Sequence, residues 1–395
     1  MLPVVLLLAA CAAPVPSPPP SARPTTSSTP TVNLIPTVTP GIINLHMFTP
    51  AVGWAQRQSD GAILHTTNGV LRWGVAAPGI GTEQIIAVAF VDAGAARLLA
   101  AVVPSPDNAG AKAVITSWAS DDGGTHWTRR GSMTDIALLG QPPGSLDFVD
   151  RQHGWYSITG LGAAGSSAIF IYRTSDGGAE WSEVDRTYVS PTPGQSKVPA
   201  GCDKNPASFI NATTGWVTAQ CNGGPYFMYV THDGGLSWRN QALAFPASQY
   251  GSQTSPPQFT TSKDGCMLAD AGTPGANSLL YVTTDGGSTW SSHATPGPSP
   301  QTLDFLDAHN GWVAGSPNSA VAPESALWVT HNAGRTWTNA APNLNLDGAS
   351  LDFVTTQLGW AFDPFPTPSS PPAELLQTTD GGHVWVVLNP AIAAT

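Results

Sequence analysis

The chain has 395 residues, with 41 Gly, 37 Pro and 14 Trp but only 15 basic residues, and its formal net charge is -11. So few cations offer no basic face to phosphates, which excludes nucleic-acid binding, and a hydrophobic fraction of 41% excludes disorder of the whole chain. The many Gly and Pro residues disfavour long helices and favour short strands joined by turns, so we expect an all-β protein.

Residues 1–10 are predicted to be a secretory signal. They contain an apolar run that is too short to cross a bilayer, which takes about 20 residues. The run ends in Leu8-Ala9-Ala10-Cys11, which resembles the lipobox of bacterial lipoproteins. The resemblance implies cleavage before Cys11, a lipid on its thiol and an extracytoplasmic protein anchored to the outer face of the membrane, at the cell surface or in the periplasm. No Lys or Arg precedes the run, which indicates a late start or a truncated signal, and an ordinary signal peptide with an incidental Cys is the alternative.

Residues 11–40 are predicted to be a tether. After Cys11 they are mainly Pro, Ser, Thr and Ala, with one Arg and no aromatic residue, so they cannot bury enough apolar surface to fold. The prolines keep such a segment extended. We therefore expect a spacer between the lipid anchor and a globular part at 41–395, in which the stretch from Val32 to Ile35 could pair as an extra strand.

An eight-residue box is repeated seven times in the globular part, as in Thr-Thr-Asp-Gly-Gly-Ser-Thr-Trp at 283–290. The closing tryptophans follow one another at intervals of 47 to 57 residues. The third position of the box holds Asn68, Asp122, Asp176, Asp233, Asp285, Asn332 and Asp380, and the last holds Trp73, Trp127, Trp181, Trp238, Trp290, Trp337 and Trp385. Asp or Asn accepts backbone N–H bonds in a tight turn and Gly supplies positive φ, so we interpret each box as a hairpin.

Each repeat also has an upstream frame, in which a Phe is followed seven residues later by a Gly-Trp tryptophan. The full frame occurs at Phe148/Trp155, Phe209/Trp216, Phe305/Trp312 and Phe353/Trp360. It is one residue shorter at Phe48/Trp54, and the Trp is replaced at Phe90/Arg97 and Phe259/Cys266. Two strands around this frame and two around the box give four strands in about 50 residues, which matches one propeller blade.

The sequence therefore predicts a single seven-bladed β-propeller with four-stranded blades, because one blade cannot bury both of its faces. We expect the ring to close either through the last strand alone or with the stretch from Val32 to Ile35 completing blade 7. The blades are predicted at about 41–77, 84–131, 143–187, 204–242, 256–294, 300–340 and 348–390.

Three cysteines follow Cys11. Cys202 and Cys221 are a plausible disulfide in an oxidising exterior, since a short loop could bring them together. Cys266 stands where other repeats carry Trp, so we interpret it as a small buried apolar residue. The spacings of Cys and His do not predict a metal site, and we expect no cofactor.

The box resembles the Asp-box, or bacterial neuraminidase repeat, of sialidases, sortilin-type receptors, xyloglucan hydrolases and the photosystem II assembly-factor family. The pattern Asp-Phe-x-(Asp/Thr)-x-x-x-Gly-Trp followed by Thr-x-Asp-Gly-Gly-x-x-Trp is most similar to that last family. The resemblance implies a seven-bladed propeller that acts as a binding scaffold, with boxes that stabilise turns at the blade periphery. It does not carry over the arginine-rich binding surface of that family, because the arginines here are scattered singly.

A glycan-active hydrolase of the sialidase-like type is the alternative. A resemblance to sialidases would imply three converging arginines, an Arg-Ile-Pro-type motif and a Tyr nucleophile with a Glu partner. No Arg-Ile-Pro occurs here, and the first repeat offers only Arg57 and Arg72, of which Arg72 lies in a box. Xyloglucan hydrolases of this type use two propellers, whereas this chain has one. We therefore expect no catalysis.

Asp147, Asp304 and Asp352 occupy one equivalent position, directly before the Phe on the predicted innermost strand. Alternate residues of that strand point toward the centre of the ring, so the three carboxylates could line a channel mouth and attract a cation such as calcium or a basic peptide. The alternative is that each Asp satisfies backbone groups of the neighbouring blade.

Interruptions at 103–112, 186–206, 240–257, 315–325 and 363–373 are rich in Pro, Ser and Gly and nearly uncharged. Such loops on a rigid scaffold are expected to carry specificity, and their composition suits protein or carbohydrate contacts. The sequence as a whole predicts a monomeric, non-catalytic envelope lipoprotein that binds a protein or a cell-envelope glycan.

Overall fold

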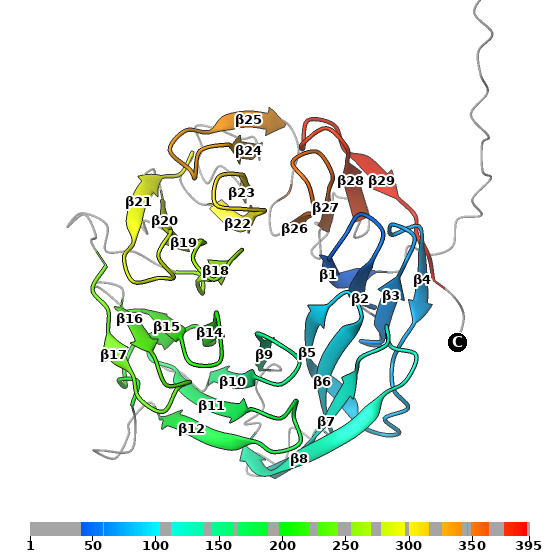
Figure 1. Ribbon diagram of the computed structural model, residues 1–395, viewed down its shortest axis with the longest axis vertical. Helices are drawn as coiled ribbons and strands as arrows, with labels where there is room; N and C mark the ends of the chain where they lie inside the picture. The colour runs from blue at the N-terminus through cyan, green and yellow to red at the C-terminus, as the bar shows by residue number, and fades with distance from the viewer. Residues whose placement is uncertain are drawn as a thin grey trace, which may run out of the picture. The chain divides into compact units, whose positions relative to one another are not determined.

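Each sequence repeat forms one antiparallel sheet, and the seven sheets follow one another around a ring (Figure 1). The computed structural model describes residues 41–57, 59–102, 112–137, 144–160, 165–188, 197–221, 227–243, 254–269, 278–296, 300–315, 326–341, 346, 349–362 and 375–392. These residues form strands and turns and no helix. The predicted seven-bladed β-propeller is confirmed. The predicted signal, Cys11, the tether and the stretch from Val32 to Ile35 lie outside the described residues.

The blades run in chain order, and the first strand of each lies nearest the centre of the ring (Figure 1). Blade 1 has β1 (Ile42–Met47), β2 (Gly53–Arg57), β3 (Ile63–Thr66) and β4 (Arg72–Val75), and blade 2 has β5 (Gln84–Asp92), β6 (Ala95–Ala101), β7 (Lys112–Ser120) and β8 (Thr128–Ala137). Blade 3 has β9 (Ser145–Phe148), β10 (Gly154–Gly160), β11 (Ala168–Thr174) and β12 (Ser182–Thr187), and blade 4 has β13 (Asp203–Lys204), β14 (Ser208–Phe209), β15 (Gly215–Gln220), β16 (Phe227–Thr231) and β17 (Arg239–Asn240).

The remaining blades keep the four-stranded pattern. Blade 5 has β18 (Gln258–Phe259), β19 (Gly265–Ala269), β20 (Leu279–Thr283) and β21 (Ser291–Ala294), and blade 6 has β22 (Pro300–Phe305), β23 (Gly311–Gly315), β24 (Ala326–Thr330) and β25 (Thr338–Ala341). Blade 7 has β26 (Ser350–Phe353), β27 (Gly359–Phe362), β28 (Leu375–Thr378) and β29 (Val386–Leu388), and it is followed by β30 (Ala391–Ile392).

Three details differ from the prediction. In blade 2, β8 runs to Ala137, past the predicted end at 131, and its ladder with β7 contains two register shifts. In blade 4, the inner strand is split into β13 and β14, which both pair with β15, because Pro206 between them has no N–H to donate to the ladder. Blade 1 gains β30 as a fifth strand.

The two halves of each repeat are docked on each other by one backbone hydrogen bond. The residue after the box Asp or Asn donates its N–H to a carbonyl in the turn between the first two strands, as Gly177 does to Gln152 at 2.9 Å. The same bond is made by Gly69, Gly123, Gly234, Gly286, Ala333 and Gly381. Most of these positions are Gly with φ between +71° and +78°, and Ala333 adopts +61°. This bond explains why frame and box recur together.

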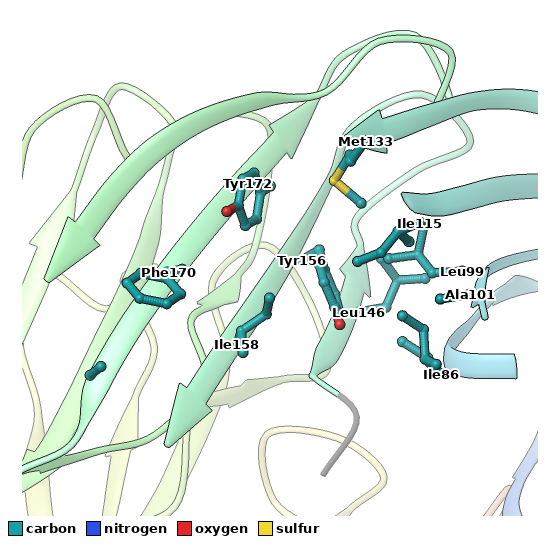
Figure 2. Packing of buried hydrophobic residues seen from close by; sticks show 12 residues of the cluster. Ile86, Leu99, Ala101, Ile115, Met133, Leu146, Tyr156, Ile158, Phe170 and Tyr172 are labelled. Atoms are coloured by element: carbon teal, nitrogen blue, oxygen red, sulfur yellow. The ribbon is translucent and has the colours of Figure 1, made fainter. Parts of the chain in front are cut away.

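The core lies between neighbouring blades. Figure 2 shows one such cluster, in which Leu99, Ile115 and Met133 of blade 2 face Tyr156 and Ile158 of blade 3. At other junctions the Gly-Trp ring stacks on the Phe of the next blade, as in Trp155 on Phe209 and Trp312 on Phe353, both with ring centres 3.6 Å apart. Most of the tryptophans therefore hold blades together at fixed positions of the repeat.

The ring closes between blade 7 and blade 1. β29 completes blade 7 by itself, and the chain then crosses to blade 1, where β30 pairs in parallel with β4 at the outer edge. The Ala391 N–H donates to the Leu71 carbonyl at 3.0 Å, and Ile392 packs against the apolar cluster of this junction. Blade 7 is thus completed by its own last strand, as in the first predicted form, and the pairing of β30 with blade 1 was not predicted.

Candidate functional site

The three equivalent carboxylates on the innermost strands each bond to the next blade. Asp147 on β9 accepts the Phe209 N–H at 2.9 Å, and Asp304 on β22 accepts the Phe353 N–H at 2.6 Å. Asp352 on β26 accepts the Met47 N–H at 2.5 Å, which joins blade 7 to blade 1. The geometry is that of the second predicted alternative, in which each Asp satisfies a neighbouring backbone group. The carboxylates lie on separate strands and do not form one cluster.

Burial dominates the titration of these groups. Desolvation raises the pKa of Asp147 to about 6 and that of Asp304 to about 7, against the opposing effect of the backbone N–H bonds. Desolvation and the charge of Asp304 raise the pKa of Asp352 to about 8. His46 Nδ1 lies 3.7 Å from Asp352 Oδ1, and desolvation lowers the pKa of His46. Both groups are therefore mainly neutral at pH 7, and their contact is not an ion pair.

A cavity of about 510 Å³ lies against the inner strands of blades 3, 4 and 5. Its described lining consists of backbone and uncharged side chains, among them Pro206, Pro257 and Ser208, and Asp147 is its one titratable group. Ser208 Oγ is buried and has no hydrogen-bond partner among the described residues. An isolated carboxyl group cannot supply both the acid and the base that glycoside hydrolysis uses. The cavity is suited to binding an uncharged polar group.

The box residues form the turns between the third and fourth strands. Asp176 Oδ1 accepts the Thr174 hydroxyl at 2.8 Å and the N–H groups of Ala179 and Glu180 at 2.9 and 3.0 Å. A matching carboxyl or amide oxygen accepts backbone N–H bonds in the other boxes, at Asn68, Asp122, Asp233, Asp285, Asn332 and Asp380. In these bonds the side chains stabilise the turns between the third and fourth strands.

The box tryptophans begin the fourth strands and pack beneath the turns. Some of them fold back on their own box, as Trp290 Nε1 does to the Gly287 carbonyl at 3.0 Å. Several of their rings pack edge-on against the Phe of the same blade, as Trp181, Trp238 and Trp385 do. Trp73, Trp127 and Trp337 also contact the core clusters of their junctions. These rings stabilise the blades.

The cysteines lie in two places. Cys202 and Cys221 form a disulfide, which joins the residue before β13 to the residue after β15. Cys266 is a buried free cysteine on β19, and burial raises the pKa of its thiol. The raised pKa keeps the group a thiol, which disfavours a nucleophilic role.

Three basic residues form hydrogen bonds or ion pairs between neighbouring blades, and the sequence analysis did not predict these contacts. Arg97 replaces the Gly-Trp tryptophan of blade 2, where it is buried and donates to the carbonyls of Ser120 and Arg151 at 3.0 and 2.9 Å. Arg151 pairs with Asp92 of blade 2 at 2.8 Å. Lys204 donates to three carbonyl groups, and desolvation lowers its pKa to about 8. The only sequence signal was Arg97 in a position otherwise held by Trp.

The described residues show neither a metal-binding group nor a membrane-spanning helix. They contain no group of three or more His, Cys, Asp or Glu side chains that could hold a metal ion. In the same part of the chain, no helix has the length and apolar character needed to cross a membrane. The predicted specificity segments lie mostly outside the described residues.

Comparison with known proteins shows the fold. No family model matches the chain, and no curated protein matches it. Similar solved structures include YCF48 from Cyanidioschyzon merolae (16% identity, TM-score 0.48, covering 90% of this chain and 97% of that one) and YCF48 bound to a D1 peptide (16%, 0.47, 82% and 90%). Prolyl oligopeptidase B from Galerina marginata is also similar (10%, 0.52), and the match covers 89% of this chain but only 51% of the peptidase. At these identities the likeness concerns the propeller alone.

Proposed function

We propose that the protein is a non-catalytic binding scaffold whose propeller presents a rigid surface to a protein or a cell-envelope glycan. The observation that carries the proposal is the use of the inner carboxylates. Asp147, Asp304 and Asp352 each accept a backbone N–H of the next blade, so each serves the ring. Arg97 and Arg151 are likewise engaged between blades.

The binding surface we favour is the cavity beside blades 3, 4 and 5. It offers about 510 Å³, a buried unpaired hydroxyl at Ser208 and almost no charge. Uncharged hydrogen-bonding groups of this kind match peptide backbone or sugar hydroxyls and do not attract phosphates. Gln258 on β18 lies exposed on its lining, which makes it a suitable position for a test.

Affinity capture from envelope extracts tests the binding role. We expect the wild-type propeller to retain a partner that is lost with Gln258→Lys, because the added cation occupies the cavity mouth. Ser292→Lys, an equally exposed change on the outer strand of the same blade, is the matched control and should retain the partner. Equal capture by both variants would place the binding surface elsewhere.

A panel of fluorogenic glycosides tests the absence of catalysis. We expect the pure propeller to release no fluorophore above the buffer rate, because the inner cavity has a single titratable group among its described lining residues. Turnover that is lost in Asp147→Asn would contradict the proposal and support the hydrolase alternative.

We further propose that the propeller is held at the outer face of a bacterial membrane by a lipid on Cys11. The support is the apolar run that ends in Leu8-Ala9-Ala10-Cys11 and the Pro-rich tether that follows. Metabolic labelling with palmitate should mark the wild-type protein and should not mark Cys11→Ser. Label that persists in Cys11→Ser, or that is absent from the wild type, would remove the lipoprotein assignment.

A further inference from the structure

The junction between blades 5 and 6 lacks the ring that fills other junctions. Trp155, Trp216 and Trp312 stack on Phe209, Phe259 and Phe353 of the following blade, with ring centres 3.6, 5.0 and 3.6 Å apart. In blade 5 the equivalent residue is Cys266, and the next Phe is Phe305. A thiol replaces an indole, while the neighbouring blades keep their places in the ring.

A cavity of about 320 Å³ occupies this junction. We call it the indole recess and define it by six of its lining residues. These are Cys266, Val282 and Trp290 of blade 5, and Phe305, Ala333 and Arg335 of blade 6. Its volume falls within the range of small-molecule sites, and an engineered apolar cavity of about 150 Å³ already admits benzene.

Side-chain exposure shows that the recess is open. Val230 and Val329, which pair with Trp216 and Trp312, are 8% and 5% exposed, whereas Val282 beside Cys266 is half-buried. Phe305 is half-buried, as is Phe259 beneath the stacked Trp216. The side of Val282 that faces the recess is therefore more accessible than its counterparts, while Cys266 at the base is 2% exposed.

The other junction without a tryptophan is filled differently. In blade 2 the Arg97 guanidinium lies over the Phe148 ring at 6.0 Å and bonds to carbonyl groups of its surroundings. Of the two junctions whose Gly-Trp tryptophan is replaced, only that of Cys266 keeps a free aromatic face. The recess is thus not a general consequence of losing the Trp.

The recess also contains a backbone carbonyl at the position that accepts the indole N–H at other junctions. Trp155 Nε1 donates to the Gly234 carbonyl at 3.0 Å, and Trp312 Nε1 donates to the Gly381 carbonyl at 2.9 Å. The equivalent box residue of blade 6 is Ala333, which lines the recess. Its carbonyl oxygen accepts no hydrogen bond from the described residues.

The charged groups at the recess leave room for such a ligand. Asp307 accepts the N–H groups of His309 and Asn310 at 2.8 Å, and Asp264 accepts the Thr261 hydroxyl, so both carboxylates are engaged in their own turns. Arg335 is exposed at the rim, where its Nη1 lies 3.5 Å from the Asn332 carbonyl. A neutral ligand therefore suits the recess, because its carboxylates already accept hydrogen bonds within their own turns.

We propose that the indole recess binds a small planar bicyclic aromatic molecule with a ring N–H, an indole-type ligand. The ring stacks on Phe305 and fills the space above Cys266, and the ring N–H donates to the Ala333 carbonyl. This site lies between blades 5 and 6 and shares Thr260 with the cavity beside blades 3, 4 and 5, but it does not depend on the proposed scaffold function.

Titration of the full chain with free indole, followed by ligand-observed NMR and by calorimetry, tests the site. Cys266→Trp is expected to abolish binding, because its own ring fills the recess, while Cys266→Ala is expected to retain it. N-methylindole, which lacks the donor, is expected to bind roughly fivefold more weakly than indole. If Cys266→Trp does not fold, Cys266→Met supplies a flexible filler that should weaken binding.

Two results would overturn the proposal. One is indole binding that is equal in the wild type and in a folded Cys266→Trp or Cys266→Met variant, since the ring would then lie elsewhere. The other is the absence of indole binding to the wild type at millimolar concentration. Equal affinity for indole and N-methylindole would overturn the assigned Ala333 hydrogen bond.

Discussion

Asp147, Asp304 and Asp352 are carboxyl groups that the fold keeps partly protonated near neutral pH. Each accepts a backbone N–H from the next blade, yet burial raises their pKa values to about 6, 7 and 8. The box carboxylates behave in the opposite way, because N–H bonds lower the pKa of Asp122 to about 2. The same residue type thus supports the ring in two charge states.

The first residue-scale prediction concerns pH. An acid whose pKa is raised in the folded state stabilises it fully below the unfolded value near 4, and this contribution is lost as pH rises through the folded pKa. We expect the unfolding free energy of the wild type to fall between about pH 4 and pH 8, by about 1.4 kcal/mol per unit for each group that titrates.

Asp352→Asn should reduce that fall, because the amide keeps an oxygen for the Met47 N–H but does not ionise. Asp307→Asn is the control, since hydrogen bonds from its turn lower the pKa of Asp307, and it should leave the slope above pH 5 unchanged. Denaturant unfolding at several pH values measures the pH dependence of the unfolding free energy for both variants. A slope in Asp352→Asn that matches the wild type would show that Asp352 is ionised throughout.

Some residue-scale features were predictable and others were not. The turn role of Asp176 follows from the box sequence, since Asp and Gly in that order specify local backbone bonds. The hydrogen-bond partner of Asp147 could not be predicted from the sequence, because Phe209 belongs to another blade and the sequence does not give the distance between blades. Cys266 was correctly predicted to be buried. The cavity beside it could not be predicted, because it depends on the distance between Cys266 and Phe305 of the next blade.

At the scale of elements, β30 is the strand that the repeats do not predict. Its two residues carry no Phe, Trp or box, so nothing in the pattern distinguishes them from a tail. They pair in parallel with β4, which already has its antiparallel partner in β3. Strands within blades followed from periodicity, whereas this pairing depends on where the ring brings its ends together.

Ala391→Pro tests the contribution of β30. Proline has no N–H, so the bond to the Leu71 carbonyl is lost, and we expect amide hydrogen exchange in Arg72–Val75 to become roughly three- to tenfold faster. Ala391→Ser keeps the N–H and should exchange like the wild type. Unchanged exchange in Ala391→Pro would show that β30 adds nothing to the edge of blade 1.

At the scale of the whole molecule, the number of blades and their order followed from the sequence because Trp and Phe recur at two fixed positions. Packing makes this possible, since most junctions hold a large ring at the same place. The proposed binding surface did not follow, because it depends on Ser208 and Gln258, which occupy positions where the repeats differ.

The path of the chain after Leu388 has a mechanical consequence. Each of the first six junctions is crossed by the polypeptide that links one blade to the next, and residues 389–390 cross the seventh on the way to β30. The segment after blade 7 therefore pairs with the outer strand of blade 1. To open the ring between blades 7 and 1, β30 must separate from β4 at the outer edge and the hydrogen bond from the Met47 N–H to Asp352 must break at the inner edge. This junction is therefore held at both its outer and its inner edge.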